Sequence, residues 1–311
     1  MVDASHVGLA RVRVDDVVHV ALVEGGVATL LPEFNGSMVD LIAGGTDRLN
    51  EARALARGAD RRRLVLESVQ LLAPIERFRR DVICAGWNYW AHFEESKGKR
   101  EGQDVERPLA PTFFTKAPDV VIGPNDPIGW DPRISAKWDY EAEIVVIIGK
   151  TCRSVPVDTA LDCVFGYCLA NDISQRDLQR RHGGQWLKGK SIDATMPLGP
   201  WIVPADAFTP DDVQLHCTVN GEMRQNASTK LMAFSIAELI AEASFGMTLH
   251  AGDVLLTGTP AGIGNAMDPP SFLVEGDEVV VRATGMGELR NRLVRADLYG
   301  GSNIVLRGVK A

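Results

Sequence analysis

Two glutamates stand two residues apart at the start of a strongly aliphatic run. Glu141 and Glu143 lead into Ile144-Val145-Val146-Ile147-Ile148, a pattern that favours a strand over residues 140–148 entering the core. Because side chains alternate along a strand, both carboxylates point to the same face. Neighbouring carboxylates repel each other and resist burial, and a bound cation relieves both costs. The spacing therefore points to a metal site.

Asp172 is the candidate for a third oxygen ligand. It follows a second strand-like run, residues 163–170, and Asn171. Three carboxylates without nearby cysteine or clear histidine ligands favour a hard ion, Mg²⁺ first and then Mn²⁺ or Ca²⁺. Spacing alone leaves another interpretation open, in which Glu141 and Glu143 lie on a solvated edge and Asp172 caps the next helix.

A histidine and a glutamate form the second candidate group. Asn88 is a possible N-cap of a short helix, which would place His92 and Glu95 at positions i and i+3, within reach of each other. A carboxylate beside an imidazole orients it and raises its basicity, as general-base chemistry requires. The polar stretch 96–106 is a candidate lid. An ordinary exposed His/Glu pair remains the alternative.

Two glycine-rich stretches carry further polar groups. Residues 184–191 match G-x4-G-K-S, but arginines precede them and Pro197 and Pro200 follow, so the strand and helix of a phosphate-binding loop are not expected. Lys190 can still place a positive charge near an anionic substrate. In residues 252–264, backbone N–H groups and the Thr259 hydroxyl could receive a carboxylate, although a plain turn is equally open.

Short strands separated by turns dominate the elements that must position these groups. Thirty glycines and sixteen prolines argue against a helical bundle. We expect a β-hairpin in residues 8–31, a helix capped by Thr46, a helix over 174–181, and a helix that starts at a Ser235/Glu238 capping box. Besides the two strands above, the runs that favour strands are residues 119–122, 214–219, 254–257, 278–282 and 303–306.

The fold class expected is a mixed, β-rich α+β protein, because strands and helices do not alternate regularly. A change of character after Pro74 suggests a small N-terminal α+β module (residues 1–75) and a main domain (80–311).

Charge and composition restrict the partners. The chain has 311 residues, 33 basic and 41 acidic, for a net charge of −8, so nucleic acid is not an expected partner. No run is long enough to span a membrane and no signal peptide is visible. The five cysteines form no C-x-x-C pair and are expected to be reduced core thiols, so we expect a cytoplasmic protein.

Taken together, these segments resemble the fumarylacetoacetate hydrolase family over about residues 80–295. The resemblance rests on Gly86-x-Asn88-Tyr89-x-x-His92-x-x-Glu95, Phe114-x-Lys116, Asp139-Tyr140-Glu141-x-Glu143, Asn171-Asp172-x-Ser174-x-Arg176-Asp177-x-Gln179, Lys190-Ser191-x-Asp193 and Thr257-Gly258-Thr259-Pro260-x-Gly262.

The resemblance implies a β-roll catalytic domain, a homodimer, and Mg²⁺ held by Glu141, Glu143 and Asp172. It also implies that His92 and Glu95 lie on a segment that orders when substrate binds. Lys190 would lie beside the reacting carbonyl. Three further positions would contact substrate or line its pocket: Lys116, Gln179 and Thr259.

The function expected is a Mg²⁺-dependent hydrolase that cleaves a C–C bond in a 2,4-dioxo acid such as an acylpyruvate or fumarylpyruvate, through a metal-bound enolate. In it, His92 and Glu95 activate water and Lys190 offsets negative charge. The alternative is a decarboxylase or isomerase of a related oxo-dioic acid, of the oxaloacetate or 2-hydroxyhepta-2,4-diene-1,7-dioate type, at the same site. A non-catalytic protein with a structural Ca²⁺ site and a phosphate-loop nucleotidase are the remaining options.

Overall fold

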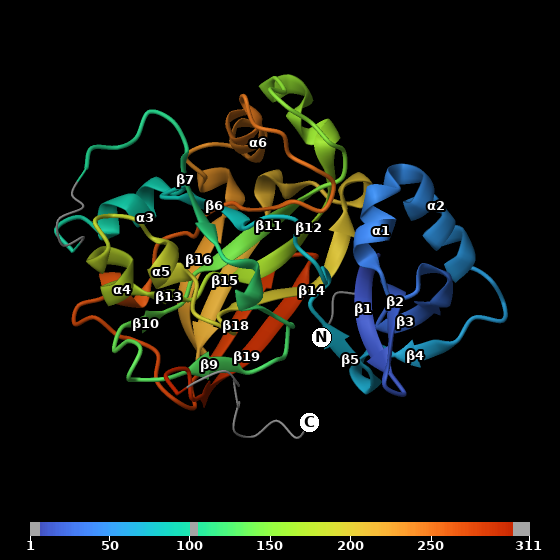
Figure 1. Cartoon of the computed structure of the whole chain (residues 1–311), viewed down its shortest axis with the longest axis horizontal. Coiled ribbons are helices and arrows are strands. Elements are labelled where there is room, and N and C mark those ends of the chain that lie inside the picture. Colours follow the sequence, from blue (N-terminus) through green and yellow to red (C-terminus); the bar gives the residue numbers. More distant parts are fainter. Residues whose placement is uncertain (1–6, 100–104, 301–311) are drawn as a thin grey trace.

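The computed structural model describes residues 7–99 and 105–300. Within them the chain is rich in strands, with few helices, as the sequence predicts (Figure 1). The strand expected at residues 303–306 and part of the candidate lid, residues 100–104, lie outside the described residues.

One large sheet runs through the whole molecule. Its strands follow the order β4-β3-β2-β1-β14-β12-β11-β17-β6-β7, with β5 paired to β1 and β8 to β14. In chain order these strands are β1 (Gly8–Val14), β2 (Val17–Glu24), β3 (Val27–Leu31), β4 (Arg63–Val65), β5 (Gln70–Leu72), β6 (Val82–Gly86), β7 (Thr112–Lys116), β8 (Val121–Ile122), β11 (Ala142–Ile148), β12 (Val164–Asn171), β14 (Met196–Pro204) and β17 (Val254–Leu256).

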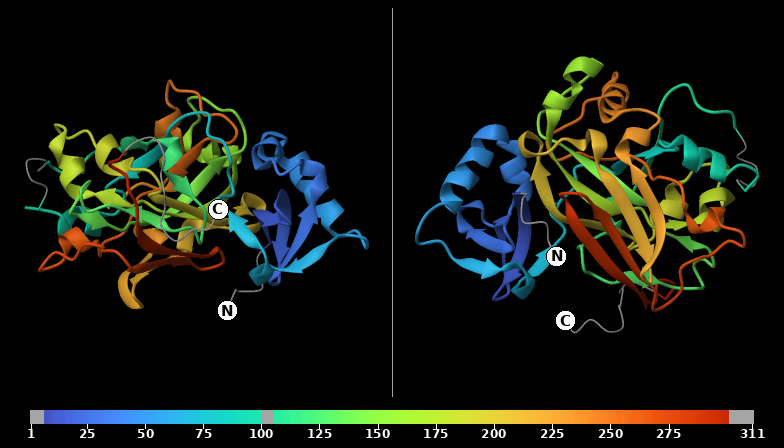
Figure 2. Two further views of the ribbon diagram at one scale, coloured as in Figure 1. Left: turned by 60° about the horizontal axis from the view of Figure 1, so that its bottom comes forward. Right: turned by 180° about the vertical axis from the view of Figure 1, so that it is seen from behind.

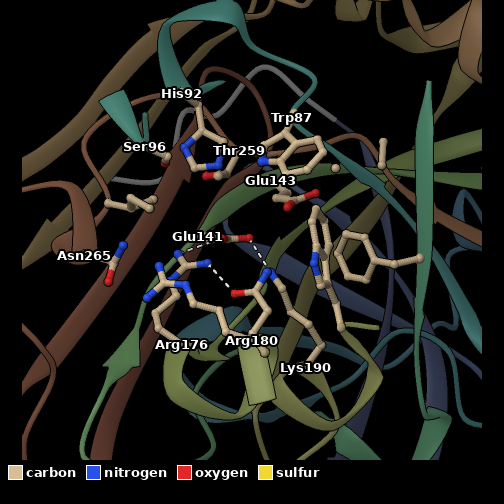
Figure 3. Close-up of a pocket in the computed structure, with 16 residues that line it drawn as sticks. Trp87, His92, Ser96, Glu141, Glu143, Arg176, Arg180, Lys190, Thr259 and Asn265 are labelled. Carbon is tan, nitrogen blue, oxygen red and sulfur yellow. Dashed lines mark hydrogen bonds and ion pairs between the residues drawn. The ribbon is translucent and has the colours of Figure 1, made fainter. Parts of the chain in front are cut away.

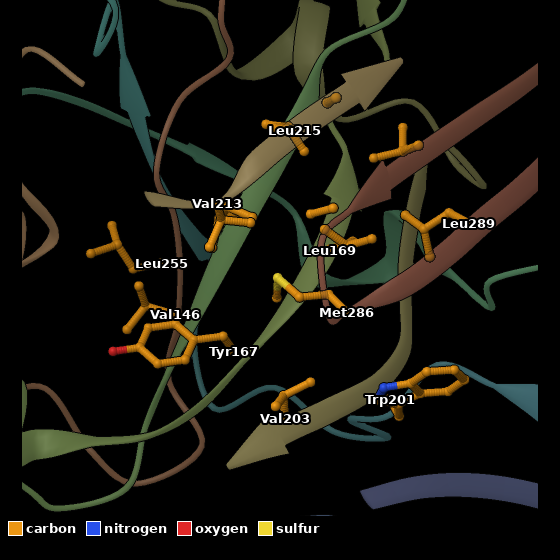
Figure 4. Packing of buried hydrophobic residues seen from close by; sticks show 14 of the residues in the cluster. Val146, Tyr167, Leu169, Trp201, Val203, Val213, Leu215, Leu255, Met286 and Leu289 are labelled. Carbon is orange, nitrogen blue, oxygen red and sulfur yellow. The ribbon is translucent and has the colours of Figure 1, made fainter. Parts of the chain in front are cut away.

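A second sheet of five strands packs against the middle of the first. Its order is β16-β15-β18-β19-β9. Residues from both sheets meet in the main core, among them Leu169, Val203, Leu215 and Leu289 (Figure 4). The strands are β9 (Ile128–Trp130), β15 (Gln214–Val219), β16 (Glu222–Ser228), β18 (Glu278–Ala283) and β19 (Gly287–Arg295), and a separate two-stranded pair is β10 (Trp138–Asp139) with β13 (Ser174–Gln175).

Strand β11 is buried on both faces, which explains its unbroken aliphatic sequence. Ile144 and Val146 belong to one hydrophobic cluster, whereas Val145 and Ile147 belong to a second cluster on the other face. A strand enclosed in this way cannot show the apolar–polar alternation of a half-exposed strand. The same burial includes Glu143 near the start of the strand and Glu141 just before it.

The helices are short and lie around the sheets. Helices α3, α4 and α5 gather at one end of the molecule, and α1 and α2 cover the N-terminal strands at the other end (Figures 1 and 2). Their bounds are α1 (Met38–Ala43), α2 (Gly45–Ala56), α3 (Trp90–Glu95), α4 (Arg176–Arg181), α5 (Leu187–Lys190) and α6 (Ile236–Ser244). No helix among the described residues combines the length and apolar character needed to cross a bilayer.

Several local predictions are confirmed and others are corrected. The Ser235/Glu238 capping box begins α6 as expected. The region 8–31 forms three antiparallel strands rather than one hairpin. Thr46 does not cap α2, which begins at Gly45 without a side-chain cap. Residues 118–120 form a 3-10 turn before β8, so the strand predicted at 119–122 is shorter.

The N-terminal strands are continuous with the main sheet. Strand β1 pairs with β14, with Leu9 opposite Ile202. The division into residues 1–75 and 80–311 stays a prediction.

Candidate active site

The pairing of β11 with β12 brings the three predicted metal ligands together. These strands are antiparallel with Ala142 opposite Asn171, so the start of one lies beside the end of the other. One residue further, the Asp172 N–H donates to the Glu141 carbonyl at 2.8 Å. Carboxylate oxygens of Glu141, Glu143 and Asp172 all lie within 4.8 Å of one another, and all three residues are buried. The structure therefore excludes a solvated edge.

Electrostatics within the trio are uneven. Burial, together with the charges of Asp172 and Glu141, raises the pKa of Glu143 well above its ordinary value. Burial also disfavours the ionised Glu141, but the charges of Lys190 and Arg176 outweigh it and hold the pKa of Glu141 below its ordinary value. Glu143 is thus the carboxylate whose charge is least compensated by the protein.

Two buried cations lie among these carboxylates (Figure 3). Lys190 Nζ lies 2.7 Å from Glu141 Oε2 and 2.7 Å from Asp172 Oδ2. Arg176 lies 2.7 Å from Glu141 Oε1 and donates from Nε to Asp139 Oδ2 at 2.9 Å. Lys190 is therefore at the centre of the carboxylate cluster, and its role beside a reacting carbonyl stays a prediction.

Sequence reasoning missed the Arg176–Asp139 pair. Asp139 is fully buried and also accepts backbone N–H bonds from Tyr140, Gly264 and Asn265. It is thus a fixed anchor for Arg176 and not a free acid. The available signal was the acidic residue two positions before Glu141.

His92 and Glu95 form the expected dyad on α3. His92 Nδ1 lies 2.8 Å from Glu95 Oε1, and the Gly262 N–H donates to Glu95 Oε2 at 2.8 Å. An ionised carboxylate can only accept, so Nδ1 carries the proton and Nε2 keeps its lone pair. His92 lines the same pocket as Glu141 and Glu143. The geometry supplies a base beside the carboxylates.

Asn88 does not cap α3, contrary to expectation. Tyr89 precedes the helix without a side-chain cap. The buried Asn88 amide instead donates to the carbonyls of Thr257 and Phe234, at 2.8 and 3.0 Å. Asn88 therefore joins the segment before the dyad to the glycine loop that follows β17.

That glycine loop holds the protein's own carboxylates. The Gly258 N–H donates to Glu143 Oε2 at 2.6 Å, as the Gly262 N–H does to Glu95. The Thr259 hydroxyl donates to the Ala142 carbonyl and accepts from Gln225 Nε2. Thr259 lines the pocket, but its hydroxyl is already engaged, which differs from the predicted role of receiving a substrate carboxylate.

Lys116 and Gln179 differ in their access to the pocket. Gln179 lines it and accepts from Arg176 at 3.1 Å. Lys116 is 0% exposed, and its ammonium donates to Asp172 Oδ1 at 2.7 Å and to the Ile173 carbonyl. The structure thus buries Lys116 against Asp172, whose carboxylate it orients, rather than at the predicted substrate contact.

The pocket encloses about 550 Å³, counting the space at its mouth. One wall is aromatic: the rings of Trp87 and Trp186 meet edge to face at 4.9 Å, and Phe114 and Trp186 lie 5.1 Å apart. Its other lining residues include Ser96, Arg176, Arg180 and Asn265, which are polar or charged. The cavity therefore combines an anionic floor, an aromatic wall and a polar wall.

The glycine-rich lysine stretch is not a phosphate-binding loop. Helix α4 precedes it where a strand would be required, and α5 ends at Lys190. These elements agree with the sequence analysis, which did not expect a phosphate-binding loop here.

The residues present fit a divalent cation. Three carboxylates converge, and Glu143 is ionised only at a cost that a nearby positive charge would remove. All the candidate ligands are oxygen donors, which suits hard ions.

Comparison with known proteins identifies the family. The model for the C-terminal domain of fumarylacetoacetate (FAA) hydrolase matches residues 81–294. The chain belongs to the fumarylacetoacetate hydrolase family. Oxaloacetate tautomerase YisK of Bacillus subtilis is 39% identical over 85% of this chain and 88% of its own. The mitochondrial oxaloacetate tautomerase Fahd2a of Rattus norvegicus is 38% identical over 89% of this chain and 87% of its own.

Solved structures agree with this assignment. A fumarylacetoacetate hydrolase from Exiguobacterium antarcticum has a TM-score of 0.80 at 38% identity, over 93% of this chain and 99% of its own. Maleylpyruvate hydrolase from Sphingobium, solved with manganese(II) and pyruvate, has a TM-score of 0.74 at 29% identity, over 93% of this chain and 99% of its own. The present chain is therefore an enzyme of this family, whose similar members include tautomerases, isomerases and hydrolases.

Proposed function

We propose that this enzyme interconverts the keto and enol forms of a four-carbon 2-oxo dioic acid of the oxaloacetate type. The observation that carries the proposal is the 39% identity to an oxaloacetate tautomerase over 85% of the chain. The site supports it because His92, a base held by Glu95, lines the same pocket as Glu141 and Glu143, two members of the carboxylate trio. This proposal corresponds to the alternative in the sequence analysis, an isomerase of an oxo-dioic acid, and not to the hydrolase that was expected first.

In this proposal the chain's own residues move one proton and hold the substrate. His92 Nε2 removes a proton from C3 of the keto acid and returns it to the 2-oxygen, so no atom is gained or lost. Glu95 keeps the imidazole in the required tautomer and stabilises its charged form. Lys190 places a positive charge beside the oxygen on which negative charge develops. The aromatic wall limits access of water from that side.

We propose Mg²⁺ as the resident metal, held by Glu141, Glu143 and Asp172, with Mn²⁺ as the substitute that one structural relative suggests. When bound, the ion supplies positive charge that stabilises the developing enolate. The cytoplasmic location stays a prediction.

The proposal is tested by removing the dyad. With Mg²⁺, the protein should speed the loss of the enol's ultraviolet absorbance above the buffer rate. His92→Ala should slow it by about 10²-fold or more, as expected for a lost general base, and Glu95→Gln should also slow it. Glu94→Gln is the matched control, because Glu94 is exposed and pairs with Arg107 on the surface; its rate should stay within about twofold.

Two results would contradict the tautomerase proposal. One is a wild-type rate no higher than buffer alone. The other is an unchanged rate in His92→Ala at full metal occupancy.

Hydrolysis of a 2,4-dioxo acid is the second candidate. It is favoured by the same dyad, which could activate water, and by the likeness to a maleylpyruvate hydrolase. Release of pyruvate from acylpyruvates distinguishes it, since tautomerisation releases no fragment. A panel with acylpyruvate, fumarylpyruvate and oxaloacetate, each with Mg²⁺ and with EDTA, compares the two activities and also detects decarboxylation.

We also propose a homodimer. Light scattering behind a sizing column should give twice the chain mass of 33.8 kDa. A mass equal to one chain at micromolar concentration would rule the dimer out.

A further inference from the structure

Two buried polar side chains in the pocket have no partner within the described chain. The Ser96 side chain and the Asn265 amide make no hydrogen bond with any described residue, although the two residues are only 7% and 6% exposed. Buried polar groups normally have hydrogen-bond partners. Both residues line the pocket, so a ligand in it can satisfy them.

The backbone fixes both residues in place. The Asn265 N–H donates to Asp139 Oδ2 at 3.0 Å, which ties it to the Arg176 anchor. Ser96 directly follows α3, and Lys99 just beyond it donates from Nζ to the Met267 carbonyl at 3.0 Å. The segment after the dyad is thereby held against the loop that carries Asn265.

Arg180 adds a positive charge to this side of the pocket. Arg176 and Arg180 both line the pocket and lie one helical turn apart on α4, about 6 Å along its axis. Arg176 reaches the buried carboxylates, whereas Arg180 lies further out. In Figure 3, Ser96 and Asn265 lie to the left with the arginines below them, and Trp87 lies across the pocket to the right.

Two other sides of the pocket disfavour a second carboxylate. Glu141 and Glu143 form its floor, and like charges there are unfavourable. The opposite wall consists of Trp87, Trp186 and Phe114, whose ring faces carry partial negative charge. Ser96, Arg180 and Asn265 line the remaining side of the pocket, to which they bring two neutral polar side chains and one cationic side chain.

We infer that Ser96, Arg180 and Asn265 form a subsite for the distal carboxylate of a dicarboxylic substrate. The inference rests on the proposed function and deepens it, because it assigns these residues the choice of a dioic acid over a monoacid. The first carboxylate and the 2-oxygen lie toward the Glu141, Glu143 and Asp172 trio, and the second carboxylate points outward along α4. The guanidinium and the Asn265 amide donate to it.

The test measures binding rather than turnover. L-malate and (S)-2-hydroxybutanoate share a carbon chain, but only malate has the distal carboxylate, and neither can tautomerise. Each is titrated into the Mg²⁺-loaded protein by calorimetry, and the wild type should prefer malate. Arg180→Gln and Asn265→Asp should weaken malate binding by about tenfold to hundredfold, as expected for a lost charge-assisted hydrogen bond. Binding of 2-hydroxybutanoate should change by less than about twofold.

Arg181→Gln is the matched control, since it removes the same charge one residue away on an exposed position that does not line the pocket. It should leave both affinities within about twofold. Asn265→Asp keeps the size of the side chain. It therefore still tests the subsite if Arg180→Gln fails to fold.

Four results would overturn the subsite: no preference for malate in the wild type, equal weakening of both ligands, unchanged malate affinity in both variants, or the same loss in Arg181→Gln. A wild type that prefers malate without accelerating oxaloacetate tautomerisation would refute the proposed function and leave the subsite supported.

Discussion

Lys116 illustrates how one buried charge can support a site without touching its contents. Its ammonium is 0% exposed and bonds Asp172 Oδ1, while Lys190 bonds Asp172 Oδ2. A buried carboxylate between two lysines has its orientation fixed by both. Removing one partner of a buried ion pair leaves an uncompensated charge, and this lowers stability by more than the intact pair contributes to it.

Replacement of this lysine separates the two roles considered for it. Lys116→Met keeps the length of the side chain but leaves Asp172 partly unpaired, so the free energy of unfolding in EDTA should fall by about 3–5 kcal/mol. Urea denaturation measures it. Lys150→Met, at an exposed position, should change stability by less than about 0.5 kcal/mol. A raised KM with unchanged stability would instead restore Lys116 as a substrate contact.

At the scale of elements, the loop after β17 connects the carboxylate trio to the dyad. Its amides at Gly258 and Gly262 reach Glu143 and Glu95, and Asn88 binds its first carbonyl. Gly258 has a φ of +92°, and a Cβ there would lie 2.8 Å from the Asn88 Cβ. Any other residue here would have a strained backbone, and its Cβ would clash with Asn88.

A matched pair of glycine substitutions tests this loop. Gly276 has the same φ of +92°, but no atom lies within 4 Å of the position of its Cβ. Gly258→Ala should therefore cost about 1–3 kcal/mol more than Gly276→Ala, the usual range for overpacking. Because it moves the amide that holds Glu143, it should also weaken Mg²⁺ binding by about tenfold. Urea denaturation and metal titration check both, and equal effects of the two variants would contradict the role of the loop.

At the scale of the whole molecule, the trio links metal binding to folding. The proposed ligands lie at adjoining ends of two neighbouring strands in the middle of the large sheet, and they converge only when β11 and β12 pair. An ion that binds the folded chain alone stabilises it, by about 2.7 kcal/mol at a hundred times its Kd.

Metal addition should therefore raise the melting temperature. Saturating Mg²⁺ should raise Tm by several degrees relative to EDTA, as followed by differential scanning calorimetry at constant ionic strength. The variant Glu143→Gln should lose most of the shift, whereas Asp211→Asn, an exposed acid outside the site, should keep it. A wild-type Tm that does not respond to Mg²⁺ would exclude a metal held by this trio.

Local pattern accounts for much of what the sequence predicted. The aliphatic run after Glu143, the capping box at Ser235 and the i, i+3 spacing of His92 and Glu95 are encoded within a few residues, and the structure has all three. Strand β14 was missed because Pro197, Pro200 and Pro204 argue against a central strand. It is nevertheless buried along its length, and its pairing with β12 is irregular.

The sequence by itself determined which residues are able to do chemistry, because residue type and strand or helix period depend on near neighbours alone. The tertiary structure decided which of them meet. Gly258 and Glu143 are 115 residues apart, and Gly262 and Glu95 are 167 apart, so no periodicity links them. Whether Lys116 faces the pocket or is buried against Asp172, and whether Asp139 is free or anchors Arg176, depends on the packing of distant segments.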